Sequence, residues 1–139
     1  MTFRQPNNKE YLINERFKNA GYFELINGSL TLVLNNLNNV EPAVYALVSG
    51  TEALYIGRTK NRVRQQLDQI KSPGIEQKTN IRIHHNLVEL IPQTGKVEIM
   101  VWFDNSLKKD NVEHLKQISE YKKFLIQKLK PRWNLQYLK

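Results

Sequence analysis

Cysteine is absent from the 139-residue sequence, which excludes a disulfide framework, a thiolate zinc site and a cysteine nucleophile. Long apolar runs are also missing, since no stretch approaches the ~18 residues that a membrane-spanning helix needs. No basic segment followed by an apolar one resembles a secretory leader. We therefore expect a soluble, cytoplasmic protein without a membrane partner.

The composition is that of one small folded domain. Hydrophobic residues make up 40% of the chain, enough for a modest core and too many for a disordered tail. The length favours a single domain, because compact domains cluster at about 100–150 residues.

Positive charge is concentrated in one part of the chain. The formal net charge is +8, yet acids and bases balance over residues 1–42, so the whole excess belongs to residues 43–139. A neutral arm followed by a basic body is typical of a protein that binds a polyanion. Nucleic acid is favoured over anionic lipid, because no basic helix with a wide, bulky apolar face is evident.

Hydrophobic periodicity divides the chain into an N-terminal arm, 1–42, and a domain, 43–139. The arm predicts a helix over 8–20 that ends at Gly21, followed by a hairpin or strand around the Asn27-Gly28 turn. The domain predicts an α/β fold, with a three-stranded, mainly antiparallel sheet flanked by helices in the order β-β-α-α-β-α. The expected strands are 43–50, 52–57 and 96–103, and the expected helices are 61–70, 80–91 (ended by Pro92) and 111–130 (ended by Pro131).

Two tyrosines occupy adjacent predicted strands, Tyr45 in AVY and Tyr55 in YIG, and the segment RTKNR and a helix follow them. Much later a helix closes with LIQKLKPRWN. With this pattern the chain resembles the GIY-YIG nucleases over residues 43–137. The resemblance implies hydrolysis of phosphodiester bonds with one divalent metal ion, Mg²⁺ or Mn²⁺. The implied substrate is DNA, with RNA as the alternative.

The same resemblance implies roles for individual residues. Tyr45 and Tyr55 would be catalytic, because a phenol can hold or deprotonate the attacking water when a cation lowers its pKa. An arginine on the first helix would bind the phosphate in bidentate fashion, and a glutamate on the last helix would hold the metal. Gly57 would let the backbone turn beside the phosphate. Trp133 is expected to pack on the last helix, and Asn134 to hydrogen-bond the chain after it.

The sequence departs from the family at the arginine. The pattern Leu-x-x-Arg-Leu, aligned on its apolar residues, puts Gln66 at that place, and an ungapped alignment puts Gln65 there. On a regular helix Arg62 lies one turn earlier, about 40° from Gln66. Arg62 is therefore the first candidate for the guanidinium, and Arg58, at the strand end, is the second.

The sequence also departs from the family at the glutamate, because Lys122 lies three residues before Leu125-Ile126. Glu120 points outward on a regular helix and could bind metal only if that helix were bulged or the alignment were shifted by two residues. Two readings stay open. Either Glu120 with Arg62 or Arg58 completes a nuclease, or the fold is a catalytically degenerate nucleic-acid-binding module. A protein-interaction domain that uses the Asn-rich arm is a third, weaker option.

Basic residues along the domain predict a track for backbone phosphates, which would add affinity more than sequence specificity. The oligomeric state is left open. The residues expected to contact nucleic acid are Gly57, Lys60, Arg64, Arg82, Lys122, Lys123 and Arg132.

Overall fold

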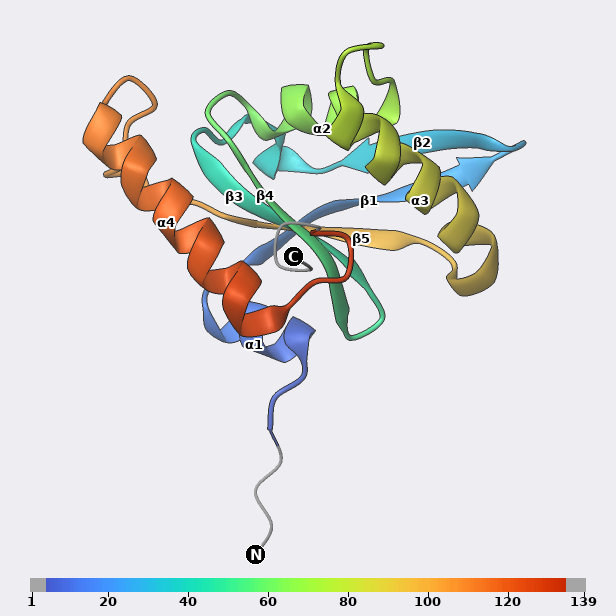
Figure 1. Cartoon of the computed structure of the whole chain (residues 1–139), viewed down its shortest axis with the longest axis horizontal. Coiled ribbons are helices and arrows are strands. Elements are labelled where there is room, and N and C mark those ends of the chain that lie inside the picture. Colours follow the sequence, from blue (N-terminus) through green and yellow to red (C-terminus); the bar gives the residue numbers. More distant parts are fainter. Residues whose placement is uncertain (1–4, 135–139) are drawn as a thin grey trace, which may run out of the picture.

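The computed structural model describes residues 5–134, which form a five-stranded antiparallel sheet with helices on both faces (Figure 1). The strand order is β2-β1-β5-β3-β4. The strands are β1 (Lys18–Ile26), β2 (Ser29–Leu34), β3 (Ala43–Ser49), β4 (Glu52–Thr59) and β5 (Val97–Trp102). The helices are α1 (Asn8–Asn14), the 3₁₀ helix η1 (Asn36–Asn39), α2 (Val63–Lys71), α3 (Lys78–Thr94) and α4 (Val112–Leu129).

The sheet has five strands where the sequence predicted three, because the arm contributes β1 and β2. Strand β5 can form hydrogen bonds with a neighbouring strand on each side, and β3 occupies one side only. On the other side β1 pairs antiparallel, with Phe23 opposite Val97. Pairing there buries Phe23 completely in the core that β3 and β5 share. The mixed α/β class is confirmed, whereas the domain boundary at residue 42 stays a prediction.

The first helix is shorter than predicted. It ends at Asn14, and Arg16 adopts a left-handed conformation (φ 73°) that a helix cannot continue through. Gly21 therefore does not end a helix but lies inside β1, beside a shift in its register with β5. A Cβ atom on Gly21 would lie 1.9 Å from the carbonyl oxygen of Val33, and its φ is 142°. Close approach of β2 thus requires glycine here.

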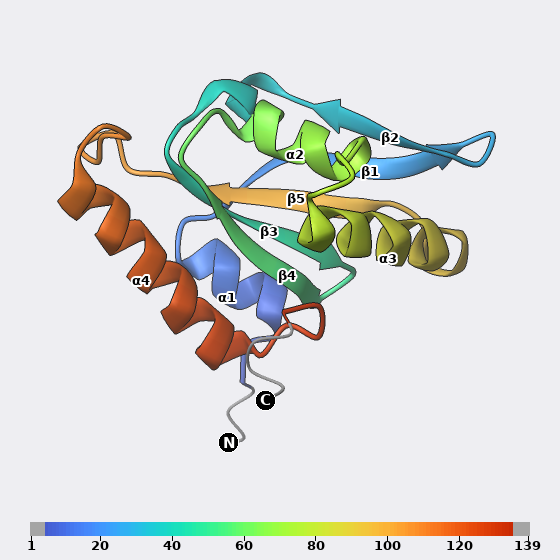
Figure 2. The same cartoon turned by 45° about the horizontal axis from the view of Figure 1, so that its top comes forward.

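Two hydrophobic cores lie on opposite faces of the sheet. One core contains Tyr45 of β3 and the buried residues of α2 and α3. The other contains Val44 of β3 and the buried residues of α1 and α4. Figure 2 shows α2 and α3 grouped on one side and α1 and α4 on the other. Since neighbouring residues of a strand point to opposite faces, β3 contributes to both cores.

Helices α3 and α4 test the expected effect of proline. Helix α4 matches its predicted range, and Lys130 adopts a left-handed conformation (φ 50°) directly before Pro131. Helix α3 continues past Pro92 to Thr94 and ends at Gly95 (φ 84°). Because Pro92 lies in the last turn, it removes only a hydrogen bond near the end of the helix. No helix within residues 5–134 has the length and apolar character to cross a bilayer.

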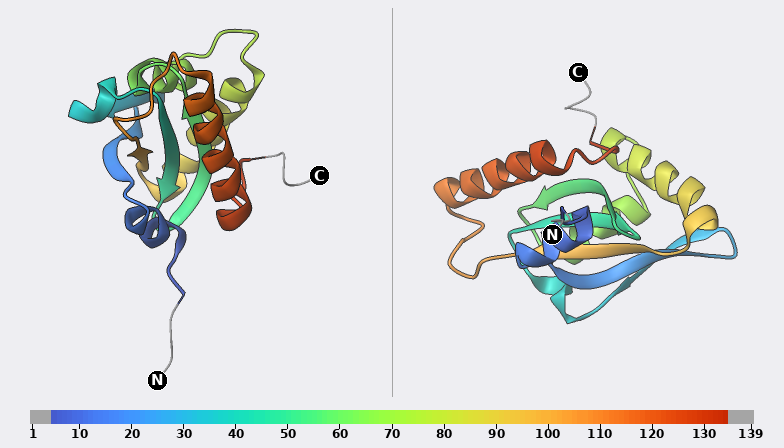
Figure 3. Two further views of the ribbon diagram at one scale, coloured as in Figure 1. Left: turned by 90° about the vertical axis from the view of Figure 1, so that its left-hand side faces the viewer. Right: turned by 90° about the horizontal axis from the view of Figure 1, so that it is seen from below.

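The segment after α4 crosses the outer edge of β4 toward α3 (Figure 3, right). The Trp133 amide donates to the carbonyl oxygen of Leu54 at 2.9 Å. The Asn134 side chain accepts from the Ile56 amide and donates to the Ile56 carbonyl, both at 2.9 Å. Asn134 therefore bonds a strand rather than the chain after the helix, which corrects that prediction.

Candidate active site

The two strand tyrosines meet on the face of the sheet that α2 and α3 cover. Tyr45 lies opposite Gly57 across the β3–β4 pair, and Tyr55 lies opposite Leu47. Cross-strand partners share a face, so Tyr45 and Tyr55 are diagonal neighbours. Their ring centroids lie 6.1 Å apart, with the planes tilted by 45°. The antiparallel hairpin predicted from the sequence thus places the two phenols side by side.

Gly57 makes room for Tyr45. A Cβ atom on Gly57 would lie 2.5 Å from Cζ of Tyr45 and 2.6 Å from its hydroxyl oxygen. Gly57 lies within β4 and is not among the glycines with positive φ. It was expected to let the backbone turn beside a phosphate. In the structure it makes no such turn and instead allows the ring of Tyr45 to lie against the strand, and its contact with a phosphate stays a prediction.

Tyr45 is a buried, neutral phenol, with 1% of its surface exposed. Burial raises the pKa of Tyr45 well above its usual range, and the nearby Tyr55 adds to this rise. The side-chain amide of Gln66 donates to the Tyr45 hydroxyl at 3.3 Å, which opposes the rise only in part. Gln66 therefore reaches the tyrosines from the position of the family's arginine, but it brings no charge.

Tyr55 is the more accessible phenol, and a guanidinium lies near it. Burial raises the pKa of Tyr55, whereas the positive charge of Arg82 and the hydroxyl of Tyr45 lower it. Arg82 belongs to α3, and its Nη1 donates to the carbonyl oxygen of Trp133 at 2.7 Å. That bond holds the guanidinium and leaves other N–H donors for a ligand. Arg82 is therefore the cation that the fold brings to the tyrosines.

Sequence reasoning placed Arg82 only in the phosphate track and missed its position beside Tyr55. The periodicity of α3 gave the local signal, because Arg82 precedes the buried Ile83 and so borders the core-facing side of the helix. That signal does not identify the strand against which the border lies. The position of Arg82 beside Tyr55 depends on the packing of α3 against the segment after α4, which local spacing does not contain.

Arg58 and Lys122 lie on the other face of the sheet. Arg58 is opposite Val44, which belongs to the core beneath α1 and α4. The half-buried Lys122 projects from α4; burial lowers its pKa, and the positive charges of Arg58 and Lys123 lower it further. The structure therefore gathers like charges on this face and does not bring Arg58 to the tyrosines.

The expected position of Arg62 relative to Gln66 does not hold. Helix α2 begins at Val63, and Arg62 has an extended conformation (φ −54°, ψ 140°) with no side-chain cap hydrogen bond. A helical angle of about 40° between the two residues therefore does not apply. Arg62 is exposed, as are the track residues Lys60, Arg64, Lys123 and Arg132. Arg132 also forms an ion pair with Glu52, with Nε and Oε2 2.9 Å apart.

The residues present do not fit a metal ion at the tyrosines. Magnesium is normally held by one or two carboxylates, and the cluster of Tyr45, Tyr55, Gln66 and Arg82 contains none. Glu120 is exposed on α4, the helix of the opposite face. Within residues 5–134 no group of three or more His, Asp or Glu side chains is placed to hold a metal.

Two solved structures share this fold. A mutant of bacteriophage T4 EndoII is 21% identical, with a TM-score of 0.57 over 71% of this chain and 73% of that one. The restriction endonuclease HPY188I in complex with product DNA is 15% identical, with a TM-score of 0.54 over 75% of this chain and 73% of that one. No protein-family model and no curated protein sequence matches. The likeness shows a fold that endonucleases use.

Proposed function

We propose that the protein is a DNA endonuclease of the GIY-YIG type, which hydrolyses phosphodiester bonds. The observation that carries this proposal is the pairing of Tyr45 with Tyr55 beside the guanidinium of Arg82, within a fold shared with endonucleases. Two phenols and a cation that converge on one side of a sheet edge supply a water-orienting group and a phosphate-binding group.

The proposed roles follow from exposure and charge. The free N–H donors of Arg82 bind the non-bridging oxygens of the scissile phosphate and stabilise the charge that develops there. Tyr55, the more exposed phenol, accepts a hydrogen bond from the attacking water. As the water attacks phosphorus, the bond to the leaving oxygen breaks. The neutral Tyr55 hydroxyl takes the proton of the water and releases its own proton to solvent, and the leaving oxygen takes a proton from solvent. The buried Tyr45, held by Gln66, positions Tyr55 and does not touch the substrate.

DNA as the partner is supported by charge. The net charge of residues 43–139 is +8, and lysines and arginines surround the start of α2. Such a surface binds the phosphate backbone with strong salt dependence. We propose DNA over RNA because one of the two structures that share the fold was solved with DNA. A requirement for Mg²⁺ or Mn²⁺ stays a prediction of the family resemblance.

A catalytically degenerate DNA-binding module is the second candidate. Gln66 and Lys122 stand where the resembled family has an arginine and a glutamate, and no carboxylate belongs to the tyrosine cluster. A protein of this kind would keep the basic surface and lose cleavage. Both candidates bind DNA, and they differ only in whether the phosphodiester bond is cleaved.

One assay separates the two candidates. Supercoiled plasmid and a single-stranded oligonucleotide are incubated with the wild-type protein and with Tyr55→Phe, in Mg²⁺, in Mn²⁺ and in EDTA. Tyr22→Phe is the control. It also removes one phenol hydroxyl, but from β1, which is separated from β4 by two strands of the sheet. Cutting by the wild type and the control but not by Tyr55→Phe supports the endonuclease. Salt-sensitive binding without cutting supports the module, and the absence of both contradicts both.

A further inference from the structure

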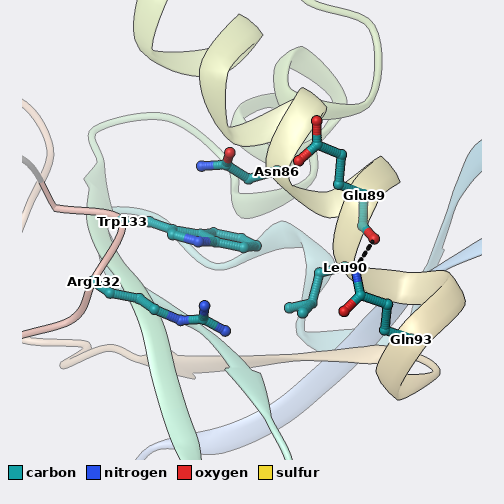
Figure 4. Close-up of a pocket in the computed structure, with 6 residues that line it drawn as sticks. All are labelled: Asn86, Glu89, Leu90, Gln93, Arg132 and Trp133. Carbon is teal, nitrogen blue, oxygen red and sulfur yellow. Dashed lines mark hydrogen bonds between the residues drawn. The ribbon is translucent and has the colours of Figure 1, made fainter.

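A pocket of about 250 Å³ lies between α3 and the segment after α4 (Figure 4). Arg132 and Trp133 reach toward α3 from one side, and four α3 side chains form the other wall. The function proposed above uses none of these six residues. They are Asn86, Glu89, Leu90, Gln93, Arg132 and Trp133.

The pocket is continuous with the candidate active site along one stripe of α3. Arg82, Asn86, Glu89 and Gln93 follow one another at spacings of four, three and four residues, so they lie on one face of the helix. Asn86 is one turn beyond Arg82, about 6 Å along the helix axis. A nucleotide whose phosphate contacts Arg82 therefore has its base, or the neighbouring base, within reach of this pocket.

The wall opposite α3 consists of two planar groups, the indole of Trp133 and the guanidinium of Arg132. The backbone of Trp133 is held on both sides, by the Leu54 carbonyl oxygen at 2.9 Å and by Arg82 at 2.7 Å. The Arg132 guanidinium is anchored through Nε to Glu52 and keeps 54% of its side chain exposed. Figure 4 shows the Arg132 side chain running alongside the indole. An anchored guanidinium is a good stacking surface for a nucleobase.

The polar groups of the pocket favour a base over a phosphate. The carboxylate of Glu89 repels a phosphate and accepts N–H groups. Gln93 donates from Nε2 to the Glu89 carbonyl oxygen at 3.1 Å, which holds its amide nitrogen against α3 and leaves its amide oxygen as an acceptor at the pocket wall. The Asn86 side chain makes no hydrogen bond within residues 5–134 and can turn toward a ligand. A carboxylate beside amides matches a base edge with adjacent N–H donors.

We propose that this pocket binds one unpaired guanine of the DNA strand next to the scissile phosphate. Among the four bases, guanine presents two neighbouring donors, N1–H and the N2 amino group, to a single carboxylate. Glu89 accepts both, Asn86 or Gln93 contacts the remaining edge, and Arg132 stacks on the ring. The assignment rests on the proposed function, because it places the pocket beside the phosphate that Arg82 binds.

Binding of single-stranded 12-mers to the full-length protein in EDTA tests the assignment without cleavage. Each fluorescein-labelled oligothymidine carries one central guanine, adenine, cytosine or abasic site, and fluorescence anisotropy gives Kd. We expect the guanine oligonucleotide to bind roughly tenfold more tightly than the abasic one, as one bidentate base contact implies. Glu89→Gln should remove most of this difference. Glu113→Gln removes the same charge from the exposed start of α4 and should keep it.

Every outcome decides the proposal, provided that circular dichroism shows both variants folded. Equal affinities of the wild type for all four oligonucleotides overturn the guanine pocket while leaving DNA binding intact. A guanine preference that survives in Glu89→Gln overturns it as well. No binding at all overturns both the pocket and the proposed function. Retention of the preference by Tyr55→Phe, together with lost cleavage, separates base recognition from catalysis.

Discussion

The two faces of the sheet differ in the polar groups that they bury: one buries a neutral hydrogen-bonded pair, and the other half-buries a lysine beside an arginine. On the α2/α3 face Tyr45 and Gln66 form a neutral hydrogen-bonded pair, and Arg82, the cation near the adjacent Tyr55, is bonded to a carbonyl oxygen. On the α4 face Lys122 is half-buried beside Arg58, and burial and like charge lower its pKa. On the first face the Tyr45 hydroxyl has a partner within the fold and Arg82 keeps donors for a ligand, whereas Lys122 forms no ion pair within residues 5–134. The difference predicts that Lys122, unlike Tyr45, is open to an anionic ligand such as a DNA phosphate.

Removal of the Arg82 guanidinium should have the largest effect. We expect Arg82→Ala to lower the cleavage rate by about 100-fold or more, because one preorganised donor to a developing charge is worth about that much. Lys122→Ala, on the other face, should change the rate by less than about threefold if it only contacts the DNA backbone. Single-turnover rates at saturating protein measure both. A greater loss with Lys122→Ala would move the reacting centre to the α4 face.

Gly57→Ala should destabilise the tyrosine side of the sheet by about 2 kcal/mol, because overpacking of a core costs about 1–3 kcal/mol. The new Cβ atom would lie 2.5 Å from Cζ of Tyr45. Gly74→Ala is the matched control, since its Cβ atom would meet nothing closer than 3.8 Å and its φ is not positive. Urea denaturation gives both free energies of unfolding. Equal stabilities would contradict the packing role of Gly57.

The buried phenol predicts a loss of stability in alkali. Because the folded pKa of Tyr45 is raised, the folded state keeps a proton that the unfolded state releases above pH 10. This contribution is complete below pH 10, and above it the free energy of unfolding should fall by about 1.4 kcal/mol per pH unit. Denaturation of the wild type and Tyr45→Phe from pH 8 to 11.5 measures the slopes. Parallel curves would show that Tyr45 ionises freely.

Lys122→Met should have the smallest effect on the free energy of unfolding, and it should raise that free energy whereas Gly57→Ala lowers it. Relief of a half-buried cation beside Arg58 should stabilise the fold by about 0.5 kcal/mol, within the range of partly screened surface pairs. The same variant should bind DNA more weakly, with the slope of log K against log salt reduced by about one. Thermal unfolding measures the expected gain in stability, and salt titrations of DNA binding measure the expected loss of affinity. A destabilised variant with unchanged DNA affinity would show that Lys122 is structural.

The elements of residues 43–134 were largely predictable because each carries its own periodicity and its own stop. Helix α4 shows this well, since its range and its end before Pro131 both matched. The structure of the arm was harder to predict. The spacing of Tyr11, Phe17 and Ala20 suits a helix, but strand β1 begins at Lys18, and Phe17 and Ala20 are buried there. Pairing with β5 is a long-range contact that local spacing does not reveal.

The candidate site was predictable in part. The adjacency of Tyr45 and Tyr55 follows from a two-strand register, which the hairpin signal contains. The separation of Arg58 from them follows from strand alternation, because Arg58 is three residues after Tyr55 on the same strand and so faces the other side. Arg82 depends on how α3 and the chain after α4 meet over β4. No pattern within α3 identifies that tertiary contact.

The closure of β4 by Asn134 has a consequence for the protein in a crowded solution. An open edge strand offers unpaired amides and carbonyls to any extended chain, and such edges nucleate aggregation. Asn134 imitates a sixth strand at one point, since its carboxamide engages both backbone groups of Ile56. A chain that stops before this residue would leave that edge open to another copy. We therefore expect the turn at Asn134 to limit self-association as well as to hold Trp133 at the pocket.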